Sequence, residues 1–179
     1  QLDVFQKPKV LVSAPSSKVL GNMLGQTDIL EYFKNKGYDV MHITSKFGAV
    51  INGKKVGREL FFQTLQDWGA DDHKQFVIFH YSILSEGINV PGLTHTIMLR
   101  NLPIIEMAQT IGRVIRVHKD DRADVAAGKI PAGAFHLYKK SEGIVTMPTG
   151  YKMGDAIAQR MQNVVNAIFV EGIPPLAFC

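Results

Sequence analysis

The chain has 179 residues, 46% of them hydrophobic, and a formal net charge of +4, which fits one domain with a real core and allows a phosphate-bearing partner without demanding one. The single cysteine, Cys179, excludes an internal disulfide framework, so we expect an intracellular, cytoplasmic setting. No apolar run approaches the ~18 residues of a membrane span and no signal-peptide pattern opens the chain, so we expect no membrane partner.

Strand and helix patterns alternate through the first half of the chain. Apolar runs predict strands over residues 9–14, 38–44 and 75–81. A helix is expected over 27–36, because Thr27 or Asp28 suits its start and Gly37 its end. A second helix is expected to begin at Val56 or Arg58 and to end at Trp68. Its apolar stripe comprises Leu60, Phe61, Thr64, Leu65 and Trp68. The glycine- and lysine-containing stretch 47–57 predicts a loop.

The second half continues the alternation. Strands are expected over 94–100 and 134–138, and the uninterrupted run from Ile104 to about Val117 predicts a helix after Pro103. Residues 143–150 are expected to connect to a last amphipathic helix over 153–169. We expect that helix to pack on this domain's own sheet, and the alternative is that it docks onto a neighbouring domain.

This alternation is typical of an α/β fold, with a parallel sheet covered by helices on both faces. In such sheets, ligands bind beyond the carboxyl ends of the strands. The segments expected at those ends are 13–18, 81–89 and 101–103.

One face of the helix predicted after Pro103 is polar. At ~100° per residue, Gln109, Gly112, Arg113 and Arg116 fall on one arc and the apolar side chains on the opposite side. An ordinary amphipathic helix with a solvated basic face is the plain interpretation. However, Gly112 costs about 1 kcal/mol against alanine in a helix interior, and such a glycine usually has a packing or functional reason. Two guanidinium groups beside a missing side chain suit an anion.

Two motifs carry a resemblance to a known family. Gln109 to Arg116 reads Q-x-x-G-R-x-x-R and resembles motif VI of superfamily 2 helicases and translocases. Upstream, Glu86 to Pro91 reads E-G-I-N-V-P and resembles their motif V, usually E-G-I-D-x-P. With the strand–helix order around the motifs, the resemblance covers residues 8–140. It implies a three-layer RecA-like α/β domain, the second one of the motor, over residues 1–145. Residues 146–179 are then a C-terminal amphipathic helix and tail.

The resemblance also implies roles in ATP hydrolysis. Arg113 and Arg116 are expected to be arginine fingers, which oppose the negative charge of the γ-phosphate as it leaves. Gln109 is expected near the γ-phosphate, and Gly112 is expected to let the helix approach the nucleotide closely.

The motif V residues are expected to face the same nucleotide. Gly87 and Asn89 match the nucleotide-facing positions. Asn89 departs from the aspartate that is commoner in the family. Its amide can still bond a ribose hydroxyl, but without the charge.

Five further residues are expected to contact the nucleic-acid backbone. Tyr81, followed by Ser82, stands where many relatives place a backbone-contacting threonine, and it suits stacking on a base or bonding a phosphate. A core tyrosine at a strand end is the alternative. Ser16, Ser17 and Lys18 follow the first strand, where relatives place backbone contacts, and an ordinary turn is the alternative.

The sequence lacks two motifs that an ATP-driven motor needs. No G-x-x-x-x-G-K-[ST] run and no D-E-x-x box occurs, and the histidines show no metal-ligand spacing. Because the chain begins at Gln1 without a methionine, we expect a fragment of a longer protein. ATP and Mg²⁺ are then expected to be held by a missing N-terminal RecA-like domain, and the isolated chain is expected to be inactive.

The expected partners are that N-terminal domain and DNA. The residues of motifs V and VI resemble those of DNA translocases, and RNA is not excluded as the nucleic-acid partner. The competing interpretation is a non-catalytic, helicase-like module that binds nucleic acid or protein.

Overall fold

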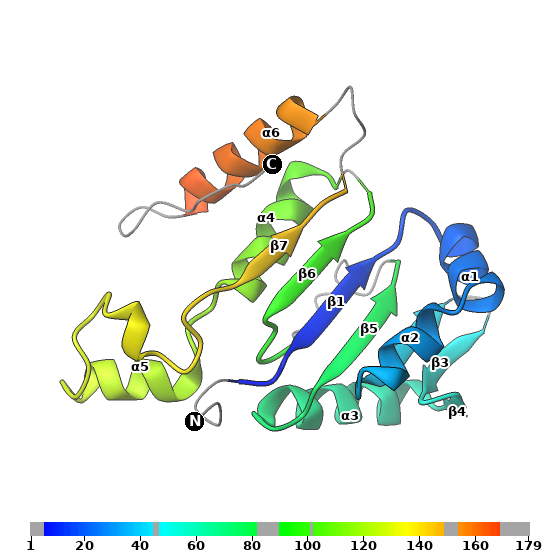
Figure 1. The fold of residues 1–179 in the computed structure, drawn as a ribbon, viewed down its shortest axis with the longest axis horizontal. Coiled ribbons are helices and arrows are strands. Elements are labelled where there is room, and N and C mark those ends of the chain that lie inside the picture. The colour runs from blue at the N-terminus through cyan, green and yellow to red at the C-terminus, as the bar shows by residue number, and fades with distance from the viewer. Residues whose placement is uncertain (1–5, 45–46, 82–89, 101, 149–153, 169–179) are drawn as a thin grey trace.

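The computed structural model describes residues 6–44, 47–81, 90–100, 102–148 and 154–168, drawn as the coloured ribbon in Figure 1. Within them, seven strands form one sheet in the order β4-β3-β2-β5-β1-β6-β7. The strands are β1 (Lys9–Ser13), β2 (Asp39–Thr44), β3 (Gly48–Ile51), β4 (Lys54–Val56), β5 (Phe76–His80), β6 (His95–Met98) and β7 (Ile144–Thr146). The helices are α1 (Ser17–Gln26), α2 (Ile29–Asn35), α3 (Arg58–Ala70), α4 (Ile104–Val114), α5 (Lys119–Ala126), α6 (Gly154–Ile168) and the short 3₁₀ helix η1 (Phe135–Leu137).

The predicted α/β class, with a sheet between two layers of helices, is confirmed, with one correction to the sheet. Strands β2, β5, β1, β6 and β7 run parallel, as expected. Strands β3 and β4 extend the sheet beyond β2 in the antiparallel direction, so the sheet is mixed. Every residue of β1 and β5 is buried, which accounts for their continuous apolar runs.

Alternate side chains of the central strands build two cores. Leu11 and Ile78 pack with α3 and with Val114 of α4 on one face. Val12 and Phe79 pack with Leu20 of α1 and the apolar side chains of α2 on the other. Figure 1 shows α1 and α2 on one side of the sheet and α3 and α4 on the other. Helices therefore cover both faces, as the sequence predicts.

The loop predicted over 47–57 is wrong, because this stretch is the β3–β4 hairpin. Asn52 and Gly53 form its turn with positive φ angles of 49° and 82°, a conformation that Asn-Gly pairs favour. The Asn52 side chain accepts a hydrogen bond from the Val40 amide at 2.8 Å, which fixes the turn against β2.

Three other predicted elements change. The helix expected over 27–36 is confirmed as α2, and α1 is an additional helix whose first residues were expected as a turn. The strand expected over 134–138 is the 3₁₀ helix η1. The last strand is β7, inside the stretch expected as a connector, and it pairs with β6.

Helix α6 packs on this domain, as expected, but mainly on α4. Its Val164 is buried in one cluster with Met98 of β6 and with Met107 and Ile111 of α4. The division predicted between residues 145 and 146 falls within β7 and stays a prediction. Among the described helices, none is long and apolar enough to cross a membrane.

Candidate nucleotide and nucleic-acid interface

Helix α4 carries most of the motif VI residues. Its buried side chains, Met107, Thr110, Ile111 and Val114, face the sheet and α6. Gln109 is exposed, while Gly112 and Arg113 are half-buried. The polar face predicted for Gln109, Gly112 and Arg113 therefore turns away from the core.

Arg116 does not lie on this helix. α4 ends at Val114, whereas a helix to about Val117 is predicted, so Arg116 stands two residues beyond the helix, in an irregular segment. Gln109, Gly112 and Arg113 therefore share one face of the helix, and Arg116 does not belong to it. The Arg116 side chain is exposed. The half-burial of Arg113 also differs from the fully exposed face that the wheel predicts.

The two arginines nevertheless affect each other electrostatically. Burial lowers the pKa of Arg113, and the nearby charge of Arg116 lowers it further. The pKa of His80, at the end of β5, falls to about 3 through burial, with smaller contributions from the charges of Arg100 and Arg113. The charges of Arg113 and Arg116 are therefore close enough to interact, and an anion placed between them would favour both charged forms.

His80 and Arg100 are polar residues beside the candidate site that the sequence patterns do not single out. His80 is buried, stays neutral at physiological pH, and shares a 3.0 Å hydrogen bond between its Nε2 and the Ser13 hydroxyl of β1. Arg100, just after β6, donates from Nη2 to Glu106 Oε2 at 3.0 Å. These contacts tie the carboxyl ends of β1 and β5 together and join the end of β6 to the first turn of α4.

Tyr81 lies at the carboxyl end of β5, and its environment combines both expected alternatives. It is half-buried and packs beside the Val12–Phe79 core. The Arg100 guanidinium lies over its ring, 4.9 Å from the centroid. A base stacking on that ring face would have to displace Arg100. Ser82, Gly87 and Asn89 lie outside the described residues.

Ser16, Ser17 and Lys18 sit at the start of α1, immediately after β1. The Ser16 hydroxyl accepts the Val19 amide at 3.1 Å and so caps the helix. Ser17 is half-buried and Lys18 is exposed. The expected turn is therefore a helix start at the carboxyl edge of the sheet, where Tyr81 also lies. The backbone of Arg116 lies away from this carboxyl edge of the sheet. The Arg116 carbonyl accepts a hydrogen bond from the Lys140 ammonium, which also donates to the carbonyl of Leu93, just before β6.

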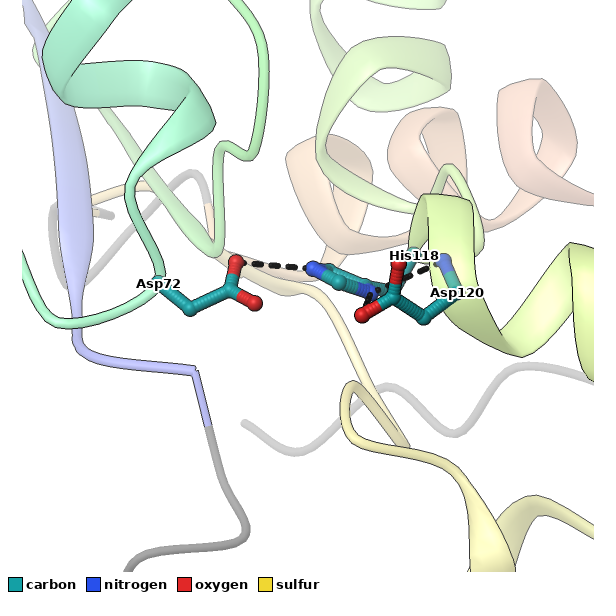
Figure 2. A group of neighbouring side chains, drawn as sticks. All are labelled: Asp72, His118 and Asp120. Atoms are coloured by element: carbon teal, nitrogen blue, oxygen red, sulfur yellow. Dashed lines mark hydrogen bonds and ion pairs between the residues drawn. The ribbon is translucent and has the colours of Figure 1, made fainter.

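His118, two residues after Arg116 in the chain, lies between two carboxylates (Figure 2). His118 Nε2 is 2.8 Å from Asp72 Oδ1, and His118 Nδ1 accepts the Asp120 amide at 3.2 Å. The three side chains are close enough to hold a metal ion. However, Lys139 already offsets part of the negative charge of this group, because its Nζ is 2.6 Å from Asp120 Oδ2 and 4.0 Å from Asp72 Oδ2. We therefore interpret the group as a charge-paired clamp between the α3–β5 loop and α5.

Gly112 provides a direct test of why a glycine stands in α4. A Cβ at this position would meet nothing within 4 Å among the described residues, so packing among those residues does not require a glycine. Gly112→Ala is therefore expected to stabilise the chain by about 1 kcal/mol, the cost of glycine in a helix interior. Urea unfolding of the chain measures this.

The matched control is Gly143→Ala. There a Cβ would lie 2.5 Å from the Val114 carbonyl oxygen, so this second replacement is expected to destabilise the chain. A loss of stability in Gly112→Ala would mean that the glycine serves the fold and not an incoming group.

Comparison with known proteins gives a likeness to a solved structure. No protein-family model matches the chain, and no curated protein matches it. A solved structure described as the C-terminal part of the Fun30 ATPase domain is similar to it, with a TM-score of 0.47 and 18% sequence identity. The likeness covers 92% of this chain and 43% of that chain, so the chain spans less than half the length of that structure.

Proposed function

We propose that this chain is the second motor domain of an ATP-dependent superfamily 2 DNA helicase or translocase. The observation that carries the proposal is the arrangement of the motif VI residues. Gln109 is exposed, Gly112 leaves open space in the described structure, and Arg113 lies near enough to Arg116 for the two charges to interact. A neighbouring domain could bring an anion to this surface without displacing any side chain at Gly112.

The anion in this proposal is the γ-phosphate of ATP. The N-terminal RecA-like domain of the same protein would hold ATP and Mg²⁺, and closure of the two domains would bring the nucleotide against α4. Arg113 and Arg116 then stabilise the charge that develops on the transferred phosphoryl group. Gln109, Gly87 and Asn89 complete the nucleotide contacts by resemblance to the family.

The nucleic-acid track in this proposal runs along the carboxyl edge of the sheet. Ser16, Ser17, Lys18 and the Tyr81–Ser82 segment would contact the backbone there. Hydroxyls, a lysine and the start of α1 are groups that bind phosphates in many proteins. Motion along DNA follows if closure over ATP shifts this edge relative to the first domain.

The decisive experiment compares phosphate release by residues 1–179 with release by the protein that includes the upstream domain. We expect the isolated chain to match a no-protein blank, with or without DNA, because it has no phosphate-binding loop and no acidic Mg²⁺ box. The longer protein is expected to hydrolyse ATP faster when DNA is present. Turnover by the isolated chain would contradict the two-domain proposal, and a longer protein without turnover would favour a binding module.

A further inference from the structure

The Lys140 side chain is buried and binds three backbone carbonyls. Its Nζ donates to Leu93 O at 2.6 Å, to Arg116 O at 2.9 Å, and to Val114 O. An ammonium has three N–H donors and no acceptor, so these contacts use all of its hydrogen-bonding capacity. Burial, aided by the charges of Lys9 and Arg116, lowers its pKa to about 8, and the side chain therefore remains charged at neutral pH.

These contacts fall where α4 ends. The last carbonyls of a helix have no partner within it, and the helix dipole makes that end negative, so a cation is favourable there. The final backbone bond that closes α4 is Ile115 N to Ile111 O at 3.0 Å. Beyond it, helical hydrogen bonding no longer fixes the path of the chain, and Lys140 anchors the Arg116 carbonyl directly.

Lys140 is itself held by a buried carboxylate. Asp121 accepts the backbone amide of Lys139 at 2.9 Å and that of Lys140 at 3.2 Å. The His118–Asp72 contact holds the same segment two residues after Arg116. The backbone of Arg116 is therefore fixed from both sides by groups that lie far from it in sequence.

We propose that Lys140 is a positioning residue for Arg116, which sets where the exposed guanidinium stands by fixing the backbone beneath it. Asp121 supports it by fixing the backbone of Lys140. The structural part of this inference concerns residues 114–118 alone. Its consequence for hydrolysis rests on the proposed function.

The structural part is tested by hydrogen exchange of the amides of residues 115–118 in the protein with its upstream domain. Lys140→Met keeps much of the side-chain bulk but removes the three donors, so exchange in this segment is expected to rise on the order of tenfold or more. Lys129→Met is the control, because it removes an exposed lysine whose ammonium pairs with Asp124 of α5. Unchanged exchange in Lys140→Met, or an equal rise in Lys129→Met, would overturn the proposal.

A second variant keeps the test decisive if Lys140→Met does not fold. Asp121→Asn retains the bulk of the carboxylate but turns one acceptor into a donor, which then faces a backbone amide. It is expected to raise exchange over the same residues. If the Asp121→Asn protein folds and exchange over 115–118 is unchanged, the proposed support of Lys140 is wrong.

The kinetic part uses a double variant. If Lys140 acts through Arg116, Lys140→Met lowers kcat by on the order of 10²-fold with KM nearly unchanged, and adding it to Arg116→Ala causes no further loss. If Lys140 had a merely structural role, Lys140→Met would lower activity both in the unmodified protein and in the Arg116→Ala variant. Such additive losses would contradict the claim that Lys140 acts through Arg116. If Arg116→Ala alone retains full hydrolysis, the proposed function fails instead, while the exchange result still decides whether Lys140 holds this backbone.

Discussion

Replacing Arg113 or Arg116 with alanine in the protein that includes the upstream domain is expected to lower DNA-stimulated ATP hydrolysis about 10³-fold or more. Arginine fingers act on charge that develops in the transition state, and in other nucleotide hydrolases they contribute effects of this order. ATP affinity is expected to change far less, because in the proposed arrangement the other domain holds most of the nucleotide. Lysine should not restore activity at either position, since a point charge cannot copy the two-pronged guanidinium.

The two replacements are expected to differ in stability. Arg116 is exposed, so Arg116→Ala should stay within about 0.5 kcal/mol of the unmodified protein. Arg113 is half-buried, so its alanine variant also loses packing of the aliphatic stem, and its melting temperature should fall further. Melting temperature, nucleotide affinity and hydrolysis must therefore be measured on the same variants.

Arg122→Ala is the matched control, because Arg122 is an exposed arginine of α5 close to Arg116 in sequence. It should retain normal hydrolysis. Arg113→Ala and Arg116→Ala could instead keep near-normal hydrolysis and lose DNA binding. In that case this surface binds nucleic acid, and the assignment of the two arginines to ATP hydrolysis is wrong.

The largest effect on folding is expected from Phe61→Ala. Phe61 is fully buried in α3 and packs in the core that joins Leu11 and Ile78 to α3. Removing its ring leaves a cavity between helix and sheet, which should cost about 3–5 kcal/mol. A domain of this kind has only about 5–15 kcal/mol of stability in total, so much of it would be lost.

Leu60 provides the control for that replacement. It is the preceding residue of the same helix, yet its side chain is 56% exposed. Leu60→Ala should therefore change stability by no more than about 0.5 kcal/mol. Chemical unfolding of the two variants measures the difference, and equal losses would mean that α3 is packed differently.

The Leu60 result also shows where sequence patterns reach their limit. The helical stripe drawn through α3 includes both Leu60 and Phe61, because adjacent residues stand only ~100° apart on a helix. The pattern predicts the helix and its general orientation. It does not decide which of two neighbouring apolar side chains reaches the core, because that depends on what the sheet presents opposite.

Several features were predictable for clear physical reasons. The buried strands β1 and β5 are continuous apolar runs, and α4 has a strong contrast between its two faces. The hairpin over 47–57 was also encoded, since Asn52-Gly53 is a strong turn signal between strand-like residues. Its lysines and glycines instead favoured a loop interpretation.

Other features have no local signature. α5 has almost no apolar periodicity and begins where His118 caps the Asp120 amide, so hydrophobic patterning does not predict it. β7 has only three residues and exists because β6 offers it an edge. The environments of Lys140 and Asp121 depend on contacts between distant segments. Nothing in their immediate sequence distinguishes them from exposed charged residues.

The hairpin has a consequence for how copies of this domain behave together in solution. Without it, β2 would present an unpaired edge with open backbone groups, which invites another sheet to join. β3 covers that edge, and the outermost strand, β4, has only three residues and carries the exposed side chains of Lys54 and Lys55. A second β4 pairing with it would bring like charges together on a very short strand. The hairpin thus protects the domain against edge-to-edge aggregation on this side.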